Sequence, residues 1–197
     1  FLSQSSDSGA IAYLMGRANT MPELAGKSAD RIAFKEDLLF AKEMDLDGIA
    51  LSFVRNADAV REAKEILGDE SKGMKIIAKI ENQEGVENME QILEEADGIM
   101  VARGDLGLEV DMEELPQLQR RMAYLCAIHG KRLIVATHLL ESMIEFPVPT
   151  RAEVTDVANA VYEQADAVML SGETSVGRHP ALVVQEMNKI IHEAEKI

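Results

Sequence analysis

The chain has 197 residues, 47% of them hydrophobic and 28% charged, which is enough to bury the core of one sizeable soluble domain. Its formal net charge of -15, from 35 acidic and 20 basic residues, argues against binding to nucleic acid or to an anionic membrane surface. The single cysteine, Cys126, excludes an intramolecular disulfide, and no apolar run is long enough to span a membrane, so we expect a cytoplasmic protein.

The chain opens with a Ser- and Gly-rich stretch that holds one weak strand candidate, Ala10 to Met15. We interpret residues 1–20 as a tail or linker and residues 21–197 as the folded domain. Five apolar runs follow, and each ends in small or polar residues. They are Asp47–Phe53, Met74–Asn82, Asp97–Asp105, Arg132–Ser142 and Ala165–Thr174.

Segments with helical periodicity lie between these runs. Apolar residues recur at three- and four-residue spacing from Val60 to Leu67 and from Val86 to Ala96. Thr150–Glu153 and Asp111–Glu114 have the form of a capping box, which predicts a helix start at each. Short apolar strands that alternate with amphipathic helices indicate an α/β fold with a parallel sheet.

Two architectures satisfy this alternation: an open doubly wound sheet and a (β/α)8 TIM barrel. Both place their sites at the carboxyl ends of the strands, where the polar residues of this chain lie. An eight-unit barrel typically takes about 250 residues, so a barrel built from these runs would be partial.

Side chains that can carry chemistry follow three of the runs. Lys79 and Glu81 are two residues apart in one strand, so they should point to the same side of the sheet. Asp105 and Thr137 lie at the ends of the next two runs. If the strands are neighbours, all four side chains face one cavity.

The two carboxylates suit a divalent cation. Mg²⁺ usually takes one or two protein carboxylates and completes its octahedron with water and phosphate oxygens, so Glu81 and Asp105 are candidate ligands. Gly104 and Gly107 bracket Asp105 and would let the backbone approach a ligand closely. The residue types equally allow a Lys–Glu surface pair followed by an ordinary turn.

Other polar residues point less clearly to a site. Ser171–Thr174 contains no standard phosphate-binding motif, and we expect a packing turn there. The four histidines lack metal-binding spacing, which argues against zinc, and only His138, next to Thr137, is expected near a site. Cys126 falls among apolar residues and is expected in the core.

Several motifs together resemble the pyruvate kinase family, in the family's order and at its spacing, from about Pro22 to the C-terminus. The matching segments are IAKIENQEG at 77–85, ADGIMVARGDLG at 96–107, ATHLLESM at 136–143, PTRAEVTDVANAV at 149–161 and ADAVMLSGET at 165–174. The resemblance implies a (β/α)8 barrel that transfers the phosphoryl group of phosphoenolpyruvate to ADP, giving pyruvate and ATP in glycolysis. It also implies Mg²⁺ or Mn²⁺, and usually K⁺, as cofactors.

The resemblance assigns roles to individual residues. Lys79 matches the family's catalytic lysine, which stabilises charge on the transferring phosphoryl group and on the enolate. Glu81 and Asp105 match its metal ligands, and the backbone of Arg103, Gly104 and Asp105 matches the loop that receives the pyruvate carboxylate. Thr137 matches the threonine near the face on which the enolate is protonated.

The chain also departs from the family. The matched region corresponds to barrel strands four to eight, so the first three strands, the phosphate-binding arginine, the K⁺ ligands, the lid domain and the C-terminal regulatory domain have no counterpart here. Val148 stands where arginine is common, which bears on subunit contacts. His138 stands where glutamine is usual, which bears on hydrogen bonding at the site.

Three functions are compatible with these observations. The chain could supply the metal and lysine part of a pyruvate kinase that is active only with the remaining parts. It could be a non-catalytic binding or assembly module. It could also be an aldolase or lyase acting through a metal-bound pyruvate enolate, which needs Glu81 and Asp105 but not Lys79.

A partial barrel leaves free strand edges, here at the runs that end in Phe53 and Thr174. Free edges tend to pair with another chain. We therefore expect a homo-oligomer or association with a complementary fragment.

Overall fold

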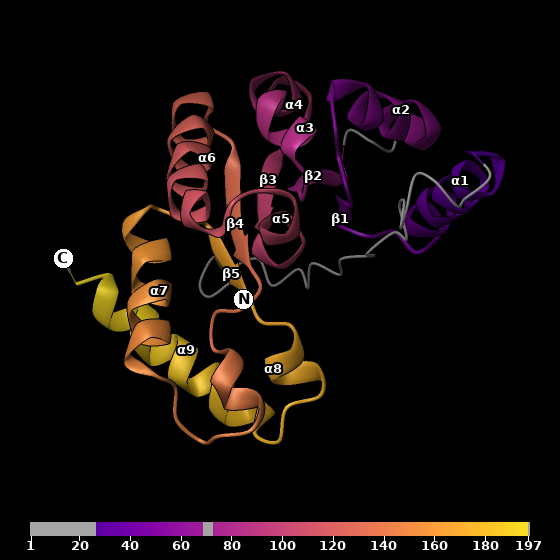
Figure 1. Ribbon diagram of the computed structural model, residues 1–197. Helices are drawn as coiled ribbons and strands as arrows, with labels where there is room; N and C mark the ends of the chain where they lie inside the picture. The colour runs from indigo at the N-terminus through magenta and orange to yellow at the C-terminus, as the bar shows by residue number, and fades with distance from the viewer. Residues whose placement is uncertain (1–26, 69–72, 197) are drawn as a thin grey trace.

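The computed structural model describes residues 27–68 and 73–196 (Figure 1). The predicted boundary after residue 20 and the strand candidate Ala10 to Met15 lie outside these residues. Among the described residues, no helix is both long and apolar enough to cross a membrane.

Five parallel strands form one sheet in the order β1-β2-β3-β4-β5, and each lies within one of the predicted apolar runs. They are β1 Gly48–Leu51, β2 Lys75–Ile80, β3 Gly98–Ala102, β4 Arg132–Ala136 and β5 Ala167–Met169. A doubly wound sheet reverses the direction in which strands are added, whereas each strand here lies beside its predecessor. This sequential order confirms the expectation of a partial (β/α) barrel.

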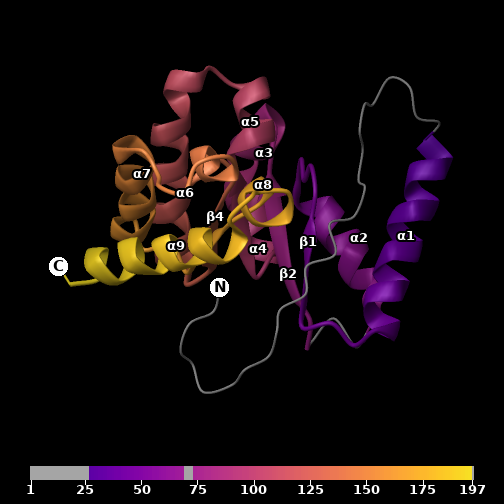
Figure 2. The same cartoon turned by 90° about the horizontal axis from the view of Figure 1, so that it is seen from below.

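Helices precede the sheet and separate its strands. The α-helices are α1 Lys27–Glu43, α2 Ala57–Leu67, α3 Gln83–Glu87, α4 Met89–Glu95, α5 Arg103–Glu109, α6 Leu115–His129, α7 Arg151–Tyr162, α8 Gly172–Ser175 and α9 Pro180–Ala194, and the short 3-10 helices are η2 Met112–Glu114 and η3 Glu141–Ile144. In Figures 1 and 2, α1 and α2 lie at the β1 end of the sheet, and α7 and α9 lie at the β5 end.

The two predicted capping boxes have different outcomes. At Thr150 the box is present, because its side chain accepts from the Glu153 amide and the Glu153 carboxylate accepts from the Thr150 amide. At Asp111 a helical turn does begin, because Asp111 is the N-cap residue of η2, but the capping box is absent: the Asp111 side chain makes no cap hydrogen bond, and the α-helix α6 begins only at Leu115. A helix starting at Asp111 would place Pro116 beyond its first turn, where proline breaks the hydrogen-bond ladder, whereas Pro116 is tolerated in the first turn of α6.

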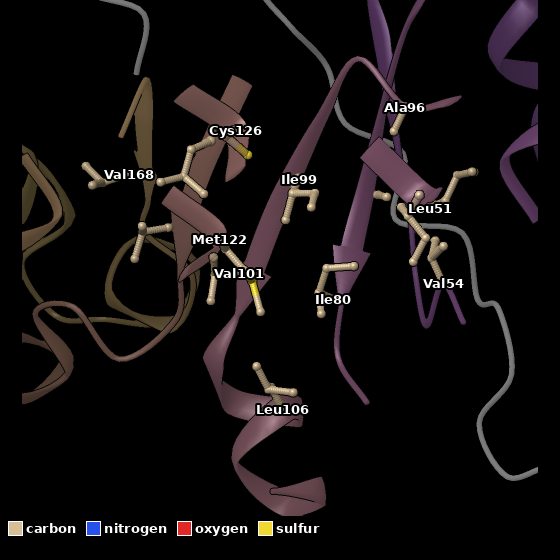
Figure 3. Close-up of a cluster of buried hydrophobic side chains, with 14 of the residues drawn as sticks. Leu51, Val54, Ile80, Ala96, Ile99, Val101, Leu106, Met122, Cys126 and Val168 are labelled. Carbon is tan, nitrogen blue, oxygen red and sulfur yellow. The ribbon is translucent and has the colours of Figure 1, made fainter. Parts of the chain in front are cut away.

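The strands alternate between two buried faces. Ile80, Ile99 and Val101 pack on the helix side of the sheet, with Leu106 of α5 and Met122 of α6 (Figure 3). The opposite face carries a separate apolar cluster. Its members are Ala50, Ile77, Met100, Ile134 and Ala136, with Ala167 and Met169 packed against them. Because side chains alternate along β2, Lys79 extends this second face beyond Ile77 toward the carboxyl end.

Aspartates just before two strands tie each to its predecessor. The amide of Asp97 donates to the Ile76 carbonyl at 2.8 Å, and its Oδ2 accepts from the Ile76 amide at 2.9 Å. Asp166 repeats both bonds with Leu133, at 2.9 and 2.8 Å. Each aspartate thereby fixes the register at the amino end of a strand pair.

Candidate active site

Lys79 and Glu81 form a buried ion pair at the carboxyl end of β2. The distance from Lys79 Nζ to Glu81 Oε1 is 2.6 Å, and the two residues are 4% and 0% exposed. The structure therefore brings this predicted pair together on one side of the strand, and its burial excludes the surface pair that the residue types alone allowed.

Two residues after β1 support this pair. Lys79 Nζ donates to Ser52 Oγ at 3.1 Å, and the Phe53 amide donates to Glu81 Oε2 at 2.6 Å. Phe53 reaches this position with a left-handed φ of 52°. Neither residue is a site candidate from its type and spacing alone, although both lie where β1 ends, beside the end of β2 that carries Lys79 and Glu81.

Asp105 lies in the first turn of α5, directly after β3, and is exposed. Burial raises the pKa of the Glu81 carboxyl, the Lys79 ammonium and the Phe53 amide act against this rise, and the negative charge of Asp105 adds to it. Asp105 thus follows β3, the strand paired with β2, at the same end of the sheet as Glu81.

A divalent cation fits this pair of carboxylates. Glu81 Oε1 is buried and accepts no hydrogen bond with good geometry, although Lys79 Nζ lies close by. Such an oxygen gains from a cation that a second carboxylate also contacts. Within residues 27–68 and 73–196 no cluster of three or more His, Cys, Asp or Glu side chains forms a metal cage, so a bound cation would need further ligands from water or substrate.

The turn after β4 is bent in an uncommon way. Thr137 and His138 are consecutive non-glycine residues in the left-handed region, with φ values of 69° and 54°. The Thr137 hydroxyl accepts from the Gly104 amide at 2.8 Å and donates to the Ala136 carbonyl at 2.6 Å. This bend brings the Thr137 hydroxyl to the amide of Gly104, the residue before Asp105 at the start of α5.

The Arg103 side chain lies along the same turn. Its Nη2 donates to the Thr137 carbonyl at 2.7 Å, and its Nη1 lies 2.7 Å from Asp156 Oδ1 of α7. The guanidinium therefore bonds to other groups of the protein. Only the backbone of Arg103 is left to contact a ligand together with Gly104 and Asp105.

The loop after β5 also contacts the turn after β4. Glu173 is completely buried, and its Oε1 accepts from the Leu140 amide at 3.2 Å while its Oε2 accepts from the Ser171 amide at 2.7 Å. These bonds agree with the packing turn expected at Ser171–Thr174. The burial of Glu173 could not be predicted from residue types, because its partners are backbone amides.

His138 is the histidine that the structure brings to this region. A Cβ placed on Gly104 would lie 3.5 Å from His138 Cε1 and 3.5 Å from Thr137 Oγ1. Both are ordinary van der Waals distances, so His138 and Thr137 lie beside Gly104 at the start of α5 without crowding it.

Comparison of the sequence with known proteins shows a family match that includes the residues of the candidate site. The family model described as "Pyruvate kinase, barrel domain" matches residues 17–184 of the chain. The chain belongs to the pyruvate kinase family. This confirms the resemblance and agrees with the barrel-type order of the five strands.

Individual pyruvate kinases align over most of this chain but over only part of their own length. The pyruvate kinase of Dictyostelium discoideum is 55% identical over 161 residues, which are 82% of this chain and 32% of that protein. The cytosolic isozyme of Solanum tuberosum is 49% identical over 82% of this chain and 32% of its own length, and the Thermotoga maritima pyruvate kinase is 49% identical over 77% and 33%. The chain therefore spans about a third of the length of the curated relatives it matches.

Proposed function

We propose that this chain supplies the lysine and metal part of a pyruvate kinase site, which transfers the phosphoryl group of phosphoenolpyruvate to ADP. The observation that carries the proposal is the buried Lys79–Glu81 pair at the carboxyl end of β2, next to the strand β3 that Asp105 follows. Membership of the pyruvate kinase family supports the reaction class.

In this reaction a phosphorus–oxygen bond of the enol phosphate breaks, and one to the terminal phosphate oxygen of ADP forms. The leaving enolate then takes a proton at its methylene carbon to give pyruvate. The Lys79 ammonium, held by Glu81 and Ser52, provides fixed positive charge for the phosphoryl oxygens and the enolate. Thr137, held by the Gly104 amide, lies at the end of β4 beside the α5 loop.

The metal and the substrate carboxylate would meet at α5. Glu81 and Asp105 would hold Mg²⁺ or Mn²⁺, which neutralises phosphoryl charge when bound. The backbone of Arg103, Gly104 and Asp105 would receive the pyruvate carboxylate at the start of α5. K⁺ belongs to the family's chemistry, but we assign it no ligand here.

A binding experiment tests the metal site. Titration of the chain with Mn²⁺, followed by the paramagnetic signal of the free ion, should show one site that Asp105→Ala weakens by at least about tenfold, because one of two carboxylates is lost. Asp111→Ala is the matched control, since Asp111 is an exposed aspartate outside the candidate site. Equal Mn²⁺ affinities for wild type and Asp105→Ala would contradict the proposal that Asp105 is a metal ligand.

A chimera tests the reaction. Replacing the matching segment of the Dictyostelium discoideum relative by this chain's residues should leave an enzyme that forms pyruvate from phosphoenolpyruvate and ADP. Lys79→Ala in that chimera should lower kcat by about 10²–10³-fold, because a preorganised charge is removed. A chimera that binds Mn²⁺ but forms no pyruvate would favour the binding-module function. Full activity without Lys79 would remove the proposed role of this lysine, and aldol cleavage of a 2-keto-hydroxy acid would favour enolate chemistry of the aldolase type.

We also propose that the protein associates through its sheet edges and acts in the cytoplasm. Within the described residues, β1 and β5 are each hydrogen-bonded to one neighbouring strand. Such edges pair with a second copy or with a complementary fragment. Light scattering across a concentration series would show a mass above that of the monomer, and a monomer at all concentrations would contradict the association. The cytoplasmic assignment is supported by the name of the potato relative, a cytosolic isozyme, and by the single free cysteine.

A further inference from the structure

The left-handed bend at Thr137 and His138 needs an external support. Left-handed backbone costs a residue with a Cβ roughly 1–2 kcal/mol, and Thr137 is also β-branched, which makes this conformation less favourable still. Histidine occurs in this region more often than most residue types, but neither residue is a glycine, and a β-branched threonine there is an outlier. A bend of this kind persists only where surrounding contacts impose it.

The Arg103 guanidinium makes such contacts with both peptide carbonyls of the bend. Its Nη2 and Nε donate to the Thr137 carbonyl at 2.7 and 3.2 Å, and Nη2 also lies 3.3 Å from the His138 carbonyl. The planar fork of arginine suits this double contact, whereas the single ammonium of lysine does not.

Asp156 of α7 fixes the guanidinium from the opposite side. Its Oδ1 lies 2.7 Å from Arg103 Nη1, and the two side chains are 33% and 13% exposed. Gln119 of α6, itself bound to Glu163 at 2.8 Å, lies 3.5 Å from the same nitrogen. The arginine therefore joins α5, α6 and α7 to the turn after β4.

We propose that Arg103 is a positioning residue: it imposes the left-handed bend that presents the Thr137 hydroxyl to the Gly104 amide, and Asp156 holds it in place. The effect on catalysis rests on the proposed function, but the effect on the bend does not. Arg103 thus acts on the site through Thr137, in addition to any contact of its backbone with substrate.

The test combines Arg103→Lys with His138→Gly and follows hydrogen exchange of the Gly104 amide by NMR. Amides of β3 are measured in the same spectra, and they correct for opening of the whole sheet. Arg103→Lys should speed Gly104 exchange by about tenfold or more relative to β3, because the bend loses its support. In the His138→Gly background the same change should speed exchange by a clearly smaller factor, since glycine at 138 removes one of the two left-handed costs of the bend and Thr137 keeps the other.

Arg178→Lys is the matched control, because Arg178 forms a 2.9 Å ion pair with Glu145 outside the bend. It should leave Gly104 exchange unchanged. If circular dichroism shows that Arg103→Lys does not fold, the Asp156→Asn variant is used in its place. Asp156→Asn keeps the guanidinium of Arg103 and removes the charge that holds this guanidinium. Asp156→Asn should also speed exchange of the Gly104 amide, and His138→Gly should reduce that effect.

Two results would overturn the proposal. One is Gly104 exchange within twofold of wild type in the Arg103 or Asp156 variant. The other is an effect of equal size with and without His138→Gly, which would mean that Arg103 stabilises the fold in general and not the bend. Mn²⁺ affinity is measured on the same samples. Absence of binding by wild type would count against the proposed function alone, because the exchange comparison does not depend on a metal.

Discussion

Glu153 joins two turns of the chain through one carboxylate. Its Oε1 accepts from the Ser142 amide at 2.7 Å, and its Oε2 accepts from the Ser142 hydroxyl at 2.6 Å and the Thr150 amide at 2.7 Å. Burial raises the pKa of this carboxyl, but the hydrogen bonds from Ser142 and Thr150 outweigh it, and the pKa is lowered from 4.5. The ionised form therefore stabilises the fold.

This gives a prediction of pH dependence. A lowered pKa in the folded state means that the stabilisation is complete above the unfolded value and is lost as pH falls through the folded value. Between pH 5 and pH 3 the free energy of unfolding should therefore fall less steeply in Glu153→Gln than in wild type. Urea titrations at several pH values measure this difference, and identical slopes would show that Glu153 contributes nothing to acid stability.

Cys126 is expected to be inert in the folded protein. Burial raises the pKa of its thiol to about 11, although a backbone contact at Ile99 opposes the rise. The thiolate is therefore scarce at pH 8, and the residue is 2% exposed. A thiol reagent at pH 8 should label the native chain only as fast as it unfolds, but label it completely in urea. Rapid stoichiometric labelling without denaturant would contradict this.

The part of the candidate site that could be predicted from the sequence is the part that follows from the alternation of side chains along a strand. Alternation along β2 placed Lys79 and Glu81 on one side, as the structure confirms. The contacts of Ser52 and Phe53 with this pair could not be predicted, because they depend on how far β1 extends beside β2. The direction of the Arg103 side chain depends on Asp156, which lies 53 residues further along the chain.

Close packing between strands makes one glycine of the sheet irreplaceable. A Cβ at Gly98, the first residue of β3, would lie 2.5 Å from the Arg132 carbonyl oxygen and 2.9 Å from its Cβ. Gly98→Ala should therefore lower the free energy of unfolding by about 1–3 kcal/mol, because the strands must separate. Urea denaturation measures the change.

Gly107→Ala is the control for this prediction. A Cβ at Gly107 of α5 would meet only the end of the Leu115 side chain, at 3.2 Å. A flexible side chain can move, and alanine favours a helix more than glycine does, so we expect a change below about 1 kcal/mol. Equal losses in the two variants would show that strand packing is not the cause.

The elements themselves could be predicted better than their ends. Each strand lies within its apolar run, because a buried parallel strand has a continuous apolar sequence. The start of α6 could not be placed correctly from Asp111, since Pro116 decides where the helix begins. A short repeat is visible in the sequence: Ala-Asp-Gly-Ile-Met at 96–100 and Ala-Asp-Ala-Val-Met at 165–169. The hydrogen bonds of its two aspartates to the preceding strand could not be predicted from this repeat.

Metal binding should stabilise the molecule as a whole. Mn²⁺ at a hundred times its dissociation constant would raise the free energy of unfolding by about 2.7 kcal/mol if it binds only the folded state. Urea denaturation with and without Mn²⁺ should show this gain in wild type and not in Glu81→Gln. A gain of equal size in the variant would place the ion elsewhere.

The order of the strands has a consequence for how the protein is made. Each strand of the sheet pairs with the strand that precedes it in the chain, so no later segment must insert between two strands already joined. A nascent polypeptide leaves the ribosome from its N-terminus at about 5–20 residues per second. The sheet can therefore grow outward from β1 during translation, and the aspartates before β3 and β5 can fasten each of these strands to its predecessor as it emerges.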